Sequence, residues 1–199
     1  MTRTKAITVF WSLFAKRADA LARIRSADEP VYDELLDQLQ SIDPGLFFEF
    51  SAQPGSCELI ITAEGDSSLF PLVDAVVSAA PQLDGWQFFA LKPKLGFPKS
   101  VVWEGYEVSI ADVVFEPLSA SGSDDLGLRL LVPGLDEGDR DKAHNGLLRV
   151  LDHGLGERAF AQAVQHTEVA TLEGPADEHI PLEDLERFIE WRRKRREPR

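Results

Sequence analysis

The chain has 199 residues, of which 44% are hydrophobic and 28% are charged, as is usual for a globular protein with a buried core. Its longest apolar runs fall far short of the roughly 20 residues that a membrane-spanning helix needs, and its N-terminal stretch shows no small-residue cleavage site. The single cysteine, Cys57, excludes an intramolecular disulfide. From these features we expect a cytoplasmic protein.

The formal net charge of −13 is unevenly distributed along the chain. Residues 1–25 and 191–199 each carry a net charge of +5, which leaves −23 for the residues between them. An acidic body argues against nucleic-acid binding, which needs a basic surface. The basic cluster over residues 191–196 is typical of a solvated helix C-terminus, and docking on the acidic body, on a neighbouring copy or on an external anion stays open.

Apolar residues at helical or alternating spacing predict the elements of the first half. Pro30 suits the first turn of a helix because its missing N–H is not needed there. Pro81 ends a helix, since the residue before a proline avoids the helical conformation. We expect helices over 7–25 and 30–42, a strand over 46–51, a hairpin turn over 53–56, a return strand over 57–63 and a helix over 69–80.

Residues 79–98 carry the clearest turn signals and the densest group of aromatic residues in the chain. Asp84-Gly85 predicts a turn, and Trp86 begins a strand that runs to Leu91, because Pro93 limits further pairing. The aromatic side chains favour burial, at about 25 cal/mol per Å² of apolar surface. We therefore predict that this is the central strand of the first half.

The second half is predicted to repeat the same order of elements. Both halves then contain a β-β-α-β unit, although they share no clear residue identity. These patterns predict an α+β fold with a mainly antiparallel sheet and helices packed on it, divided at 1–98 and 99–199 or forming one compact domain. We expect strands over 106–116 (with a bulge near 111–112), 126–132 and 166–172, a polar loop over 119–125, a helix from 139 that is interrupted at 154–157, a short helix to 164 and a final helix from 181.

The common sequence signatures of an enzyme site are absent. The sequence contains no phosphate-binding loop, no dinucleotide-binding glycine motif, no nucleophile elbow and no His-Glu-x-x-His motif. Their absence argues against a common hydrolase or a nucleotide-dependent enzyme, but it does not exclude an enzyme of a rarer class.

Two short stretches resemble metal sites, and both have a simpler interpretation. His153 and Glu157 have the spacing of two ligands on one helix face, but Gly154 and Gly156 weaken a helix there. Residues 136–141 are acidic but lack the alternation and the final glutamate of a calcium loop, and they favour a helix N-terminus instead. We expect no metal and no cofactor.

Carboxylates near the first hairpin are the candidates for acid–base chemistry. Glu49, Glu58 and Glu64 lie on or beside its strands, and paired carboxylates transfer protons when they share a pocket. Strand alternation places Glu49 opposite its aromatic neighbours, so a solvated sheet face is the alternative. Cys57 has no fixed histidine partner in the sequence and is expected to pack as a small hydrophobic residue.

Several short motifs extend over most of the chain and include Pro44-Gly45-Leu46-x-x-Glu49, Thr62-Ala63-Glu64-Gly65 and Ala80-Pro81-x-Leu83-x-Gly85-Trp86. They are similar to motifs of a family of uncharacterised bacterial proteins. The resemblance implies a domain of unknown function, and it brings no activity, cofactor or catalytic residue with it. The matching residues fit turn glycines, a helix cap and aromatic core positions.

We predict two functions of different classes. The first is a non-enzymatic, acidic protein-binding module that neutralises a basic partner, as immunity proteins do with secreted toxins. The second is an enzyme with an unrecognised carboxylate site at Glu49, Glu64 and Asp66. We select Glu64, Asp66 and Trp86 as binding candidates. The expected partner is another protein of basic charge or a second copy of the chain, and not a membrane or a nucleic acid.

Overall fold

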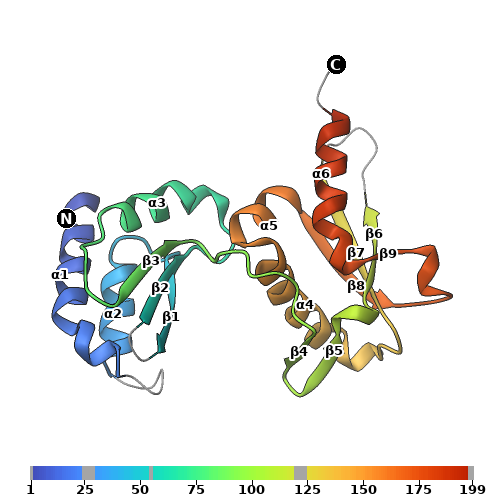
Figure 1. Ribbon diagram of the computed structural model, residues 1–199, viewed down its shortest axis with the longest axis horizontal. Helices are drawn as coiled ribbons and strands as arrows, with labels where there is room; N and C mark the ends of the chain where they lie inside the picture. The colour runs from blue at the N-terminus through green and yellow to red at the C-terminus, as the bar shows by residue number, and fades with distance from the viewer. Residues whose placement is uncertain (1, 24–29, 54–55, 119–124, 197–199) are drawn as a thin grey trace. The chain divides into compact units, whose positions relative to one another are not determined.

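The computed structural model describes residues 2–23, 30–53, 56–118 and 125–196 (Figure 1). The chain divides into two compact units, Met1–Pro93 and Lys94–Arg199, and each has its own sheet and core. Residues 119–124 of the loop predicted over 119–125 and the turn residues 54–55 lie outside the described residues. Within the described part of the chain, no helix is both long and apolar enough to cross a membrane.

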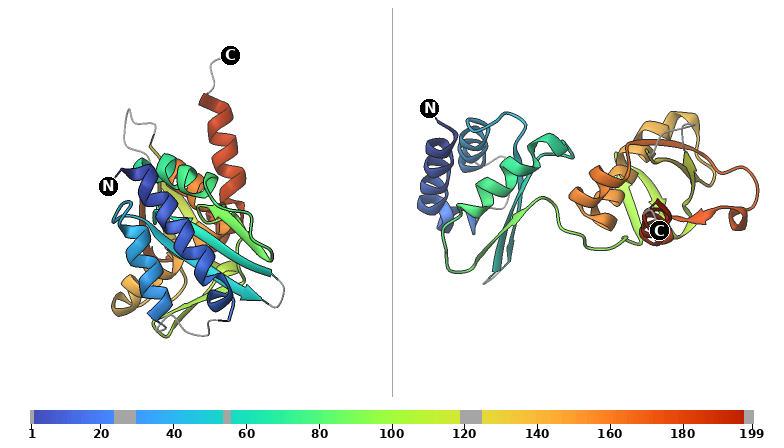
Figure 2. Two further views of the ribbon diagram at one scale, coloured as in Figure 1. Left: turned by 90° about the vertical axis from the view of Figure 1, so that its left-hand side faces the viewer. Right: turned by 90° about the horizontal axis from the view of Figure 1, so that it is seen from above.

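Three helices pack on one side of the first sheet (Figure 2). Pro30 is the first residue of its helix, as predicted. The first helix begins at Arg3 and not near Ile7, because the apolar stripe marks only the buried part of a helix and its first turn is exposed. The helices are α1 (Arg3–Leu21), α2 (Pro30–Gln40) and α3 (Phe70–Ser78).

The first sheet contains β1 (Phe47–Gln53), β2 (Ser56–Thr62) and β3 (Trp86–Ala90), in the order β1-β2-β3. β1 and β2 form an antiparallel hairpin, whereas β3 pairs with β2 in parallel after the crossover through α3. The prediction that residues 86–91 form the central strand is therefore wrong, because β2 is central and β3 is at the edge. Aromatic content indicates that a strand is buried but not where it lies in the sheet.

Aromatic rings fill the core between α1 and β3. Trp11 and Phe14 of α1 contact Phe88, with ring centroids 4.8 Å and 5.4 Å apart, and Phe14 also contacts Trp86 at 4.8 Å. The Trp11 indole Nε1 donates a hydrogen bond to the Val76 carbonyl of α3 at 2.8 Å. These contacts define the covered face of the sheet, so side chains at the alternate strand positions point to the opposite face.

The second unit begins with the hairpin of β4 (Ser100–Trp103) and β5 (Tyr106–Ser109) and continues into a larger sheet. The single strand predicted over 106–116 is wrong in its middle, because the 3₁₀ turn η2 (Ile110–Asp112) turns the chain from the hairpin into the next sheet. β4 was not predicted. The larger sheet has the order β8-β7-β6-β9, with β6 (Val114–Leu118), β7 (Gly127–Val132), β8 (His166–Thr171) and β9 (Ile180–Pro181).

The helices of the second unit are α4 (Arg140–Leu155), α5 (Glu157–Ala163) and α6 (Leu185–Arg196). Gly156, with a φ of 80°, separates α4 from α5 where the interruption was predicted. The last helix does not begin at Pro181, because this residue pairs in β9 and the 3₁₀ turn η5 (Leu182–Asp184) precedes α6. Apolar residues of the strands and helices form one core, which includes Phe115, Leu128, Leu130, Leu147, Leu151 and Leu185.

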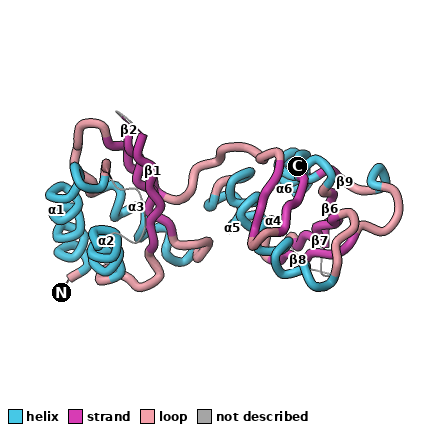
Figure 3. Tube along the Cα trace, turned by 90° about the horizontal axis from the view of Figure 1, so that it is seen from below, coloured by secondary structure: helices cyan, strands magenta, loops and turns pink. Residues whose placement is uncertain are grey.

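The same β-β-α-β arrangement occurs in both units (Figure 3). The unit is β1-β2-α3-β3 in the first half, and β6, β7, α4 with α5, and β8 in the second. In each, the first two of these strands pair antiparallel, and the third pairs in parallel with the second. A 3₁₀ turn precedes the crossover helix in both, namely η1 (Ser67–Leu69) before α3 and η3 (Glu137–Asp139) before α4. The predicted α+β class with two related β-β-α-β units is confirmed, and most strand pairs among the described residues are antiparallel.

Candidate functional site

Two of the predicted site residues meet at one lysine in the first unit. Glu49 of β1 and Glu64, which follows β2, both form ion pairs with Lys92, which follows β3. The Lys92 Nζ lies 3.6 Å from Glu49 Oε1 and 3.1 Å from Glu64 Oε2. The lysine side chain is 14% exposed, whereas the two glutamate side chains are about half exposed. Sequence analysis missed Lys92, which reaches the glutamates because β3 lies beside β2.

The other predicted residues are Glu58, Asp66 and Trp86. Glu58 lies in β2, opposite Ser51 of β1 and Gln87 of β3. Asp66 accepts hydrogen bonds from the Ser68 backbone N–H at 3.0 Å and from its hydroxyl at 2.6 Å, and it thereby caps η1. Trp86 lies on the helix-covered face, edge-on to Phe14. The structure therefore brings together Glu49 and Glu64 but not Asp66 or Trp86.

A lysine between two half-exposed carboxylates is typical of a surface ion-pair cluster. Its positive charge compensates the glutamates, and both of them stay accessible to water. The arrangement holds the open face of the sheet together electrostatically. The enzyme site at Glu49, Glu64 and Asp66 stays a prediction.

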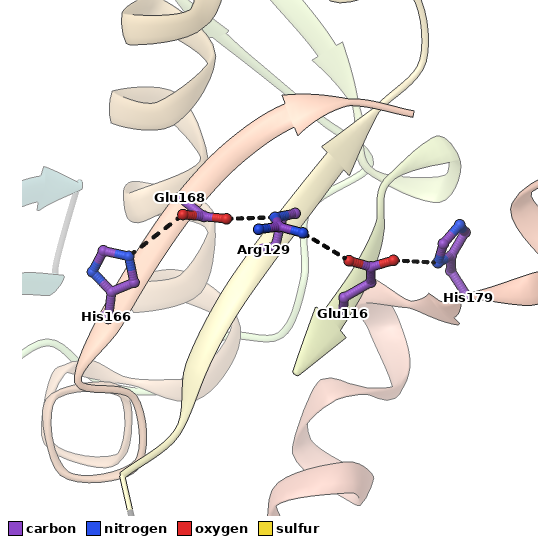
Figure 4. A network of polar contacts seen from close by, with 5 residues as sticks. All are labelled: Glu116, Arg129, His166, Glu168 and His179. Carbon is purple, nitrogen blue, oxygen red and sulfur yellow. Dashed lines mark hydrogen bonds and ion pairs between the residues drawn. The ribbon is translucent and has the colours of Figure 1, made fainter. Parts of the chain in front are cut away.

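A longer row of charges crosses the larger sheet of the second unit (Figure 4). Arg129 of β7 lies between Glu168 of β8 and Glu116 of β6, and its Nε donates to Glu168 while its Nη1 lies 3.3 Å from Glu116 Oε2. His166 Nε2 lies 3.7 Å from Glu168, and His179 Nδ1 lies 3.4 Å from Glu116. Because the alternate strand residues point into the core, the row lies on the face opposite α4 and α6.

Arg129 and Glu168 shift each other's pKa. The hydrogen bond to Glu168 and its charge raise the pKa of Arg129, and the hydrogen bond from Arg129 holds the pKa of Glu168 below its usual value of 4.5. The two side chains are 42% and 40% exposed, so water and salt weaken their attraction. With a lowered pKa in the folded state, Glu168 stabilises the fold above pH 4.5, and this stabilisation is lost as the pH falls through the lowered value.

Replacing Arg129 with glutamine should therefore reduce the loss of stability in acid. We expect the thermal unfolding midpoint of the wild type to fall more steeply between about pH 5 and pH 3 than that of the variant, because the variant lacks the cation that lowers the pKa of Glu168. Circular dichroism at several pH values measures both profiles. Arg187→Gln is the control, since this arginine side chain is 84% exposed. Identical slopes for the wild type and Arg129→Gln would contradict the expectation.

A second candidate surface lies at the turn of the β4–β5 hairpin. Trp103 and Tyr106 are cross-strand partners, and the turn residues Glu104-Gly105 between them have φ values of 48° and 80°. Gly146 of α4 lets the hairpin approach closely, because a Cβ there would lie 3.3 Å from the Trp103 Cβ. The guanidinium of Arg149, on the next turn of α4, lies 4.3 Å from the centre of the Trp103 ring. The hairpin is thus fixed against α4.

Carboxylates gather around this hairpin. Burial raises the pKa of Tyr106, and the charges of Asp139 and Asp136 raise it further. Lys142 donates to Asp139 at 2.8 Å, and this bond, with the charges of Asp139 and Glu104, raises the lysine pKa. These effects place Asp136 and Asp139 near Tyr106, and Asp139 and Glu104 near Lys142. We define the hairpin surface as Val102, Trp103, Glu104, Tyr106, Glu107, Asp136 and Asp139.

The metal-like spacing of His153 and Glu157 does not bring the two side chains to one site. His153 is exposed and its Nδ1 lies 2.5 Å from the Gly96 carbonyl oxygen, whereas Glu157 is fully buried at the start of α5. Among the residues that the structure describes, no group of three or more His, Cys, Asp or Glu side chains is arranged to hold a metal ion. Cys57 is buried in β2.

No family model, curated protein or solved structure matches the chain. The resemblance to uncharacterised bacterial proteins therefore stays a prediction. The function has to be argued from the surfaces of the two units.

Proposed function

We propose that this protein is a non-enzymatic, acidic module that binds a basic protein partner through the hairpin surface. The observation that carries the proposal is the group of carboxylates at one hairpin, where Glu104 and Glu107 are exposed and Asp136 and Asp139 lie near Tyr106. Aromatic residues are enriched in the well-packed centres of protein interfaces, and surrounding carboxylates attract and orient lysine and arginine side chains. The net charge of −13 adds a long-range attraction for a basic partner.

The exposure of the hairpin supports a binding role. Val102 is 60% exposed, and its cross-strand partner Glu107 is also exposed. Among the described strands, β4 and β5 pair only with each other, so each has an edge without a strand partner. Val102 and Glu107 lie on the hairpin face opposite Trp103 and Tyr106, which pack against α4 and the core. The open face therefore offers an apolar and an acidic group side by side. An immunity-like role, in which the basic partner is a secreted toxin, is the narrower form of this proposal.

The test compares two double variants with the same change in charge. Glu104→Lys/Glu107→Lys reverses two carboxylates of the hairpin surface. Glu183→Lys/Glu190→Lys reverses two exposed carboxylates elsewhere in the second unit. The tagged wild type and both variants are incubated with a lysate of the source cells at low salt, and the retained proteins are identified by mass spectrometry at increasing salt.

We expect the wild type and the control pair to retain the same basic protein, which elutes as the salt concentration rises. The hairpin pair should retain at least about tenfold less of it, because reversed charges repel the partner from the surface. Equal loss with both pairs would show that net charge alone acts and would contradict the proposal. Undiminished retention by the hairpin pair, or an empty wild-type sample, would also contradict it. Circular dichroism verifies that each variant is folded.

A further inference from the structure

A groove in the second unit shares no residue with the hairpin surface. It lies between α5, α6 and the residues that begin β7, and its volume of about 460 Å³ is in the range of sites for small organic molecules. Its apolar side chains are Leu126, Ala159, Ala163 and Ile189, and its cations are Arg192 and Arg193. Ala163 and Ile189 also pack against the core of the unit.

Hydrogen bonds connect the segments that form this groove. The Arg192 Nη2 donates to the Asp125 carbonyl oxygen at 3.0 Å and thereby joins α6 to the residues before β7. The Gln165 side-chain oxygen accepts from the Leu126 backbone N–H at 2.9 Å, and the Gln165 backbone N–H donates to the Leu126 carbonyl at 2.9 Å. These bonds hold Arg192 and the segments that form the groove in a fixed relation before any ligand arrives, whereas Arg193 is exposed beside them.

The groove is positively charged within an acidic protein. Among its described lining residues, Asp125 is the one carboxylate, so two arginines leave a formal charge of +1 where the whole chain carries −13. Lys194 and Arg195 follow on α6, and the Arg195 guanidinium lies 4.7 Å from the centre of the Trp191 ring. Arginine binds carboxylates with two parallel hydrogen bonds, which a point charge does not provide. The groove therefore combines an anion-binding end with an apolar wall.

We propose that this groove binds a small amphipathic carboxylate. The carboxylate group pairs with Arg193 beside Arg192, and the apolar chain lies along Ala159, Ala163 and Ile189. A short polar anion would leave the apolar wall in contact with water, and a neutral apolar molecule would not pair with the arginines. A ligand that matches the groove therefore needs both a carboxylate and an apolar chain.

Three probes separate the two parts of this recognition. Octanoate has both a carboxylate and an apolar chain, 1-octanol has the chain alone, and acetate has the carboxylate alone. Each probe is titrated into the ¹⁵N-labelled full chain, and its binding is measured from the shifts of backbone amide NMR signals and by calorimetry. We expect octanoate to shift the signals of Ala159, Ala163 and Ile189 in a saturable way and to bind at least about tenfold more tightly than the other two probes.

Arg193 and its neighbour Lys194 supply a matched pair of variants. Arg193→Gln should weaken octanoate binding at least about tenfold, whereas Lys194→Gln, on the same helix but outside the groove lining, should leave it unchanged. Ala163→Leu fills the groove and should prevent binding. Both Arg193 and Lys194 are exposed, so their variants are expected to fold even if Ala163→Leu does not.

Three results would overturn the inference. The first is equally tight binding of octanol and octanoate, which would leave a purely apolar groove. The second is an equal loss of binding with Arg193→Gln and Lys194→Gln, which would indicate a general attraction to the basic end of α6. The third is the absence of a saturable shift with octanoate. None of these results bears on the hairpin surface, which contributes no residue to the groove.

Discussion

An alanine in place of Phe14 should lower the free energy of unfolding of the first unit by about 3–5 kcal/mol. The Phe14 side chain is 0% exposed, and its ring lies 4.8 Å from that of Trp86 and 5.4 Å from that of Phe88. Removing the ring loses its apolar burial and leaves a cavity. The adjacent Trp11 is held by its hydrogen bond to Val76, so it does not move freely into the space.

Hydrogen exchange measured by mass spectrometry in the full chain tests this expectation for the first unit alone. Peptides from β2 should exchange faster in Phe14→Ala than in the wild type, by an amount that corresponds to the lost free energy. Phe47→Ala is the matched control, because it removes the same side chain from a position that is 37% exposed. It should cost less than half as much. Equal effects of the two substitutions would show that the aromatic cluster around Phe14 is not the centre of this core.

The elements that build this core could be predicted because helix and strand periods are local properties of the sequence. The apolar stripe of α1 includes buried residues such as Phe10, Phe14 and Leu21, and Glu49 is exposed opposite its aromatic neighbours, as the strand alternation predicts. These local patterns do not predict the position of each strand in the sheet, because that position depends on the crossover through α3. Leu59 and Ile61 of β2 are both 0% exposed, whereas the more aromatic β3 is only half-buried at the edge. Aromatic density was therefore a poor guide to the central strand.

The hairpin surface could not be predicted because its two parts, residues 102–107 and 136–139, are distant in the sequence. Residues 136–141 were correctly noted as acidic, but nothing in them indicates that Tyr106 lies beside them. β4 has four residues and begins two residues after Pro98, so its alternation is too short to predict a strand. The signal that would have found the hairpin is Glu104-Gly105 between two short runs of strand-forming residues.

The three-stranded sheet of the first unit and the four-stranded sheet of the second each carry a cation between two glutamates on the face opposite their helices. Lys92 contacts Glu49 and Glu64 in the first unit, and Arg129 contacts Glu116 and Glu168 in the second. The sequence indicated the first two glutamates but neither cation, since each contact needs strands that pair only after folding. Composition therefore predicts that a surface is acidic. The cations that pair with its carboxylates can be identified only once the order of the strands in the sheet is known.

Replacing Glu157 with alanine should destabilise the second unit by about 3–5 kcal/mol. Its side chain is 0% exposed at the first residue of α5, where the helix dipole favours a negative charge. A buried carboxylate persists in a fold because donors are directed at it, and truncation leaves these donors buried without their acceptor. The spacing of Glu157 from His153 is typical of a pair of metal ligands, but its complete burial indicates a structural role.

Urea unfolding of the full chain, combined with hydrogen exchange of β7 peptides, measures this loss. Glu157→Gln keeps the shape and one acceptor oxygen, so we expect a smaller loss than with alanine. Glu190→Ala removes an exposed carboxylate from the same unit and should change the stability by less than about 0.5 kcal/mol. If Glu157→Ala matched Glu190→Ala, the buried carboxylate would contribute nothing to folding. A buried charge that the fold does not need is most often kept for function, so that result would return Glu157 to the candidate site residues.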